Sequence, residues 1–155
     1  MTGTGQPIDI GILLAAAYQE FVRELRAALA AQGFEDTGRS DGYVLRALAG
    51  GPITVSALAD RLEITKQGAG QLVDAMTERG YLERQADPAD RRARLVALAP
   101  RGQQALQAAR RFHHRYERKL VRAHGPEAVT ALRTLLTAIA ANAGAEDPRL
   151  RAFYV

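Results

Sequence analysis

The residues best suited to recognising another molecule begin at position 65. Gln67 and Gln71 are four residues apart, so in a helix both would stand on one face. A glutamine amide can pair with two atoms on the edge of adenine in duplex DNA. Thr65 and Lys66 would begin that helix and meet phosphate there, because the free amide groups and the dipole of a helix N-terminus favour an anion.

Two glycines, Gly68 and Gly70, interrupt this helix. Each costs about 0.8–1.0 kcal/mol relative to alanine, so we expect a soft helix whose backbone can approach a duplex closely. The opposite face carries the apolar stripe expected to be buried, namely Ala69, Leu72, Val73 and Met76.

Arginine dominates the second candidate stretch, a turn-rich loop at residues 87–92 between two strand-length segments, 81–86 and 93–98. Two strands around such a loop predict a β-hairpin. Arginine suits a narrow minor groove because negative potential is concentrated there. We expect Asp90 to hold a neighbouring guanidinium, because a carboxylate directed at phosphate would be repelled. The cationic side chains of this tip are Arg91, Arg92 and Arg94.

The elements that must position these residues follow from apolar spacing and from helix start and stop signals. Ser40, Thr54 and Thr65 are expected N-caps, Pro100 is expected at a first helical position, and Ile53 is expected to pack on Leu58. Helices are expected over residues 8–31, 40–49, 54–62, 65–79, 100–123 and 126–144.

The two short helices that meet at Glu63-Ile64 predict a helix-turn-helix, and the hairpin after it is the wing of a winged helix. We therefore expect a mainly α fold with six helices and a small β-hairpin wing. Residues 37–99 would form the winged helix-turn-helix lobe, and residues 1–36 with 100–155 a second lobe. The terminal helices carry more apolar surface than so small a domain can cover, which predicts a homodimer with interleaved helices.

Length and composition limit the remaining classes of protein. The chain has 155 residues and no cysteine, so disulfides and thiolate chemistry are excluded. No apolar run approaches the roughly 20 residues of a membrane span, and the first residues do not resemble a secretion signal. We thus expect a cytoplasmic protein without a membrane partner. Its formal charge of +4 and pI near 9.8 suit a nucleic-acid partner without requiring one.

Catalysis, metal binding and bound cofactors are not expected. His113, His114, Glu117 and His124 lack the spacing of a zinc motif, and surface or core histidines explain them better. The sequence contains neither a phosphate-binding glycine loop nor a serine nucleophile elbow.

Aromatic residues with polar ends suggest a small-molecule cavity between the long helices and the winged helix. Such residues suit a phenolic or carboxylic ligand, although an aromatic stripe at helical spacing is more often part of a core. The candidates are Tyr18, Phe21, Tyr43, His113 and Tyr116.

Residues 65–74, 80–84 and 87–94 together resemble the recognition helix and wing of MarR-type regulators, named for multiple antibiotic resistance. Over the rest of the chain the likeness is one of helix order. Ala99 departs from the family pattern, which has Thr or Ser before the helix that follows the wing. The most specific part is a wing signature of an acidic residue, an arginine and a further basic residue: Asp90, Arg92 and Arg94.

The resemblance implies a homodimeric transcription factor that binds a pseudo-palindromic operator in double-stranded DNA, more often as a repressor than an activator. The recognition helix would enter the major groove and the wing arginine the minor groove, and a small phenolic or aromatic-acid ligand would release the DNA. The absence of cysteine excludes the peroxide-sensing branch of the family. The alternatives are a non-specific architectural DNA-binding protein and a protein-interaction module that uses the winged helix without DNA.

Overall fold

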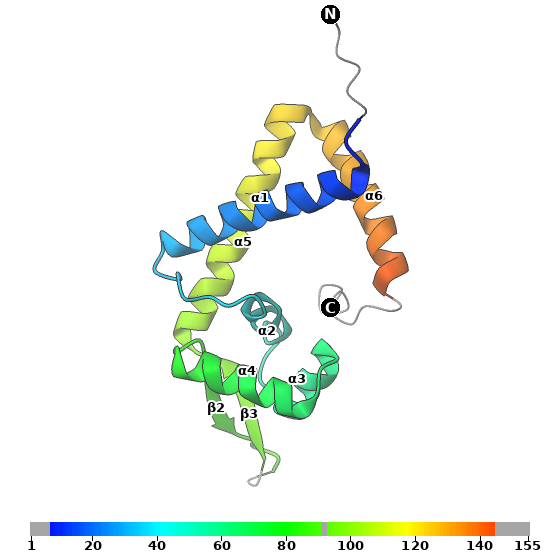
Figure 1. Cartoon of the computed structure of the whole chain (residues 1–155). Helices are drawn as coiled ribbons and strands as arrows, with labels where there is room; N and C mark the ends of the chain where they lie inside the picture. Colours follow the sequence, from blue (N-terminus) through cyan, green and yellow to red (C-terminus); the bar gives the residue numbers. More distant parts are fainter. Residues whose placement is uncertain (1–6, 91–92, 145–155) are drawn as a thin grey trace, which may run out of the picture. The chain divides into compact units, whose positions relative to one another are not determined.

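The structure is a computed structural model that describes residues 7–90 and 93–144. The chain divides into two compact units, Met1–Glu35 and Asp36–Val155. The mainly α fold with a winged helix-turn-helix is confirmed (Figure 1). In chain order the described elements are α1 (Ile10–Ala30), α2 (Asp41–Ala47), β1 (Ile53–Thr54), α3 (Val55–Leu62), α4 (Lys66–Glu78), β2 (Leu82–Ala86), β3 (Arg94–Leu98), α5 (Pro100–His124) and α6 (Pro126–Gly144).

The first unit contains α1 and its stop signal. Gly33 has a φ of +86°, a left-handed conformation that favours glycine after a helix. The amide of Phe34 then donates to the carbonyl of Leu29 at 3.0 Å. Helical spacing places Ile10, Tyr18 and Leu29 on one face of α1; Leu29 is buried, whereas Ile10 and Tyr18 are 75% and 63% exposed. Much of that face is therefore open to solvent in the single chain.

The core of the second unit lies where the helix-turn-helix packs on the base of the wing. Two of the three expected N-caps are confirmed: Thr54 accepts a hydrogen bond from the Ala57 amide and Thr65 one from the Gly68 amide, both at 3.1 Å. Ser40 precedes α2 but makes no side-chain cap, so that expectation was wrong. Its helical φ and ψ do not suit an N-cap, which normally has extended backbone. The largest fully buried side chains are Tyr81, Leu48, Leu58, Met76, Val44, Val73 and Val96.

The wing is part of a three-stranded antiparallel sheet with the order β1-β3-β2. The expected hairpin is present, with Leu82 opposite Leu98 and Ala86 opposite Arg94. Strand β1 was not expected, because two residues are too short to produce a periodic pattern. Ile53 pairs there with Val96, so the segment before α3 ties the helix-turn-helix to the wing.

Helix α5 begins at Pro100, as expected, after Ala99, which provides no side-chain cap. Helical spacing predicts that this helix buries a stripe of Leu106, Ala109, His113, Tyr116 and Leu120. That prediction is wrong, because His113 is exposed and the other four are only half-buried. The stripe failed because small residues let the α5 backbone approach the core closely. A Cβ at Gly102 would lie 2.1 Å from the carbonyl oxygen of Tyr81. The face actually buried comprises Gly102, Ala105, Ala108 and Phe112.

Helix α6 packs beside α5, and an ion pair of 2.5 Å joins Arg133 to Glu117 between them. Helical spacing predicts an apolar face of Leu132, Leu135, Leu136 and Ile139. In the single chain this face is uncovered, with the four side chains 44%, 64%, 42% and 56% exposed. In the described ranges 7–90 and 93–144, none of the helices has the length and apolar character needed to cross a membrane.

Candidate nucleic-acid interface

Helix α4 exposes the polar face that its sequence predicts. Lys66, Gln67 and Gln71 are exposed, while Ala69, Val73 and Met76 are buried on the other side. Leu72, expected in the buried stripe, is only half-buried. Thr65 is also exposed, but its hydroxyl is occupied as the helix cap. The two glutamine amides and Lys66 are thus the side chains most available to a duplex.

The two glycines of α4 have different surroundings. A Cβ at Gly68 would lie 3.2 Å from the hydroxyl oxygen of Thr65, whereas a Cβ at Gly70 would meet nothing within 4 Å. Gly68 therefore leaves room for the helix cap. Gly70 is half-buried, and no neighbouring atom requires a glycine there. The expectation that a glycine lets the backbone approach a duplex closely therefore stays a prediction for Gly70 alone.

The wing tip is described only in part. Asp90 and Arg94 are exposed, whereas Arg91 and Arg92 lie outside the described residues. Asp87 stabilises the turn, because its carboxylate accepts a hydrogen bond from the Ala89 amide at 2.8 Å. The expectation that Asp90 holds a neighbouring guanidinium stays a prediction. An Asp followed by Pro and a small residue is a recognisable turn signal and could have indicated Asp87.

An ion pair between Arg84 of β2 and Asp74 of α4, 2.6 Å long, links the wing to the exposed side of the recognition helix. Their side chains are 39% and 72% exposed, so the pair adds little stability. Its effect is to fix an arginine beside α4 and to neutralise the carboxylate of Asp74.

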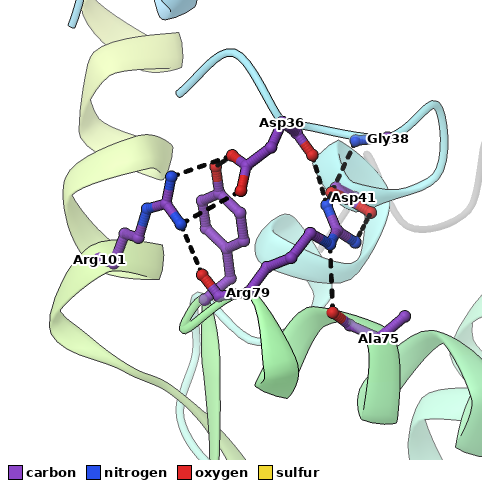
Figure 2. Close-up of polar contacts among 7 residues, drawn as sticks. Asp36, Gly38, Asp41, Ala75, Arg79 and Arg101 are labelled. Atoms are coloured by element: carbon purple, nitrogen blue, oxygen red, sulfur yellow. Dashed lines mark hydrogen bonds and ion pairs between the residues drawn. The ribbon is translucent and has the colours of Figure 1, made fainter. Parts of the chain in front are cut away.

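A polar cluster of Asp36, Asp41, Arg79 and Arg101 (Figure 2), to which Tyr81 also belongs, holds the loop before α2 against the end of α4 and the start of α5. Asp41 is 2% exposed. Its carboxylate accepts hydrogen bonds from Arg79 at 2.6 and 3.3 Å and from the Gly38 amide at 2.7 Å. Hydrogen bonding to Asp41 raises the pKa of Arg79.

The other half of the cluster surrounds Tyr81. Arg101 donates to both carboxylate oxygens of Asp36, at 3.0 and 3.2 Å, and to the carbonyl of Arg79 at 2.6 Å. Its guanidinium lies 4.5 Å from the centre of the Tyr81 ring.

The Tyr81 hydroxyl donates to Asp36. That hydrogen bond, helped by the charge of Arg101, lowers the pKa of Asp36. Burial, followed by the contact with Asp36, raises the pKa of Tyr81 to about 12.

Sequence reasoning missed this cluster because the hydrogen bonds between its side chains link residues 38 to 65 positions apart. The nearest signal is the sequence Arg79-Gly80-Tyr81, in which Gly80 has a φ of +76°. That conformation ends α4 and places an arginine and a tyrosine on either side of the turn. The cluster therefore sets where the recognition helix ends relative to α2 and α5.

The expected ligand pocket stays a prediction. Tyr18 and Phe21 belong to the unit Met1–Glu35, whereas the other three candidates belong to the unit Asp36–Val155. Within the second unit, Tyr43 and Tyr116 are half-buried, and the Tyr116 ring lies 5.7 Å from that of Phe112. Partial burial, followed by the charges of Arg46 and His114, lowers the pKa of His113.

These elements define a winged helix-turn-helix protein with an exposed, amide-bearing recognition helix. Residues 35–93 match the family model described as MarR family. One curated relative, the exopolysaccharide II synthesis transcriptional activator ExpG of Rhizobium meliloti, is 27% identical over 119 residues. The match covers 77% of this chain and 60% of ExpG, so the chain spans about three fifths of that relative.

Solved structures agree with this fold. RV1404 from Mycobacterium tuberculosis superposes with a TM-score of 0.72 at 24% identity, over 90% of this chain and 96% of that chain. FabT from Streptococcus pneumoniae, solved in complex with DNA, has a TM-score of 0.72 at 20% identity, with coverages of 84% and 92%. A cysteine-to-serine mutant of MarR from E. coli gives 0.61 at 22% identity, with coverages of 87% and 98%. Residues 35–93 are thus similar to the MarR family, and the solved structures share the fold of this chain.

Proposed function

We propose that this protein is a sequence-specific, DNA-binding transcriptional regulator that acts as a homodimer. The observation that carries the proposal is the exposed face of α4, where Gln67 and Gln71 stand one turn apart beside Lys66. Inserted in a major groove, two amides at this spacing read neighbouring base pairs, each worth about 1–3 kcal/mol of discrimination. FabT, with a similar fold, was solved with DNA, which supports the same type of ligand here.

Charge favours base readout over purely electrostatic binding. Residues 37–99 contain nine Lys and Arg against eight Asp and Glu. A lobe so close to neutral attracts phosphates weakly as a whole. Specific hydrogen bonds from α4 must then supply most of the discrimination, and local contacts from Arg92 and Arg94 add affinity for any sequence. A non-specific architectural protein would need a larger excess of positive charge on this lobe.

Dimerisation is supported by the uncovered apolar side chains of α6 and α1, including Leu135 at 64% and Ile10 at 75% exposure. Large exposed apolar patches are typical of surfaces that bind another protein. Two copies would present two recognition helices to half-sites about one helical turn apart. We further propose repression, relieved by a small aromatic ligand that changes the spacing of these helices.

The test is a footprint of the purified protein over the DNA next to its gene, followed by titration of wild type and variants. Wild type is expected to prefer that DNA over random duplex by a factor on the order of 10³ or more. Gln71→Ala should reduce this preference, and Arg92→Ala should weaken binding to every sequence. Equal affinity of wild type for both duplexes would leave an architectural protein, and no affinity for either would leave a protein-interaction module.

A further inference from the structure

The positive charge of this protein is concentrated outside the winged helix-turn-helix. Helix α5 alone carries seven Lys and Arg and a single acidic residue, Glu117. Its net charge of +6 exceeds the +4 of the entire chain. Most of these cations lie in the second half of the helix, far along the sequence from the wing, so the proposed reading of DNA by α4 does not account for them.

The cations occupy one side of α5. At 100° per residue, Arg111, Arg115, Arg118 and Arg122 fall within an arc of about 60°; we call these four residues the arginine face. All four are exposed. The buried positions are centred about 100° away around the helix, and Glu117, which pairs with Arg133 of α6, also lies more than about 90° from the centre of the face. The arginine face is thus separate from the core and from the contact with α6.

Within the described part of the chain, three of the four arginines on this face are uncompensated. Arg115, Arg118 and Arg122 have no ion-pair partner among the described residues. The nearby pair of Glu117 with Arg133 directs the single carboxylate of α5 toward another cation. Such a row of like charges destabilises an isolated helix, and an anionic partner bound along the row would offset that cost.

The spacing of the four arginines fits a nucleic-acid strand. Along the helix axis they rise in steps of about 6, 4.5 and 6 Å, a total of about 16 Å on a rigid rod. One strand of a duplex presents about five phosphates over that length. Guanidinium groups bind phosphate through paired hydrogen bonds. By contrast, a small anion would use only one or two of these side chains.

We propose that the arginine face is a second, sequence-independent nucleic-acid site, separate from α4 and the wing. The arginine face begins at Arg111, about 16 Å along α5 from its start. It continues toward the end of α5 that is farther from β3 (Figure 1). The stretch of DNA held by α4 is therefore not the stretch that the arginine face contacts. The site would take either a second duplex or a distant segment of the same DNA.

The test uses the full chain, a fluorescent random-sequence duplex of about 20 base pairs and anisotropy at low salt. A head variant, Lys66→Ala with Arg92→Ala, disables the proposed reading surface. We expect it to retain duplex binding, and we expect further replacement of Arg115, Arg118 and Arg122 by Gln to reduce the remaining affinity at least tenfold. A matched variant replaces three exposed arginines outside α5 by Gln, namely Arg23, Arg26 and Arg39, and should keep most of that affinity.

Several results would overturn the proposal. The head variant could lose all duplex binding, or the matched variant could lose as much affinity as the α5 variant. Polyglutamate could compete as well as DNA at equal charge, which would indicate an acidic polypeptide partner. A change of oligomeric state in the α5 variant, measured by light scattering, would indicate a contact between copies. Because Lys66 and Arg92 are replaced throughout this test, the outcome of the test does not depend on sequence-specific binding by α4. The footprint of wild type measures that binding separately.

Discussion

Substitution of Asp41 by Asn should destabilise the protein far more than its position in a short surface helix indicates. Asp41 is the one buried charged side chain among the described residues, and it accepts three hydrogen bonds. An Asn at this position retains one acceptor oxygen, but its NH2 group is a hydrogen-bond donor and would face the donors of Gly38 and Arg79. Arg79 would then keep a charge without its closest carboxylate, while still donating to the carbonyls of Asp36 and Ala75.

The magnitude follows from burial. Removing one partner of a buried pair costs about 3–5 kcal/mol. The Arg79 side chain is 27% exposed, so solvent recovers part of this cost, and we expect a loss of about 2–3 kcal/mol. For a chain of this size, that loss corresponds to a decrease in Tm of about 4–12 °C. The unfolding free energy is measured by urea titration with far-UV circular dichroism as the signal.

The matched control is Asp74→Asn, which removes the exposed ion pair with Arg84 of the same 2.6 Å length. We expect this control to cost at most about 1 kcal/mol. A double-mutant cycle of Asp41→Asn with Arg79→Gln should give a coupling of about 1–3 kcal/mol. If Asp41→Asn were no more destabilising than Asp74→Asn, or if the coupling were near zero, burial would not be the source of the effect.

Three further predictions concern the neighbourhood of Tyr81. Because the pKa of Tyr81 is raised to about 12, its protonated hydroxyl stabilises the folded protein below about pH 10, and this stabilisation is lost as pH rises toward 12. Tyr81→Phe should remove the tyrosine that ionises at the highest pH in an ultraviolet titration. The lowered pKa of Asp36 stabilises the fold above about pH 4 and ceases to do so at lower pH, so an Asp36→Asn variant should lose less stability than wild type between pH 5 and pH 3. Gly102→Ala should lower the free energy of unfolding by at least about 2 kcal/mol, because its Cβ would lie 2.1 Å from a backbone oxygen. The control Gly70→Ala, whose Cβ meets nothing within 4 Å, should raise it by about 0.5–1 kcal/mol in thermal melts. Equal effects of the two alanines would contradict the packing described here.

The sequence by itself determined the elements whose signals lie within a few residues. Thr54 and Thr65 cap helices through bonds to amides three positions later, and Gly33 and Gly80 end helices through positive φ values. The polar face of α4 and the hairpin of the wing followed from periodicity in the same way. Such features are predictable because the hydrogen bonds that define them close over three or four residues.

Only the tertiary structure decided which face of α5 is buried and which distant charges meet. The stripe of large side chains on α5 was the wrong guide, because Gly102 lets the backbone itself pack against Tyr81. Asp36 and Arg101 are 65 residues apart, and no local pattern links them. Their contact depends on how α4, α5 and the loop before α2 are packed, since an ion pair across the fold forms only after the core has fixed both ends.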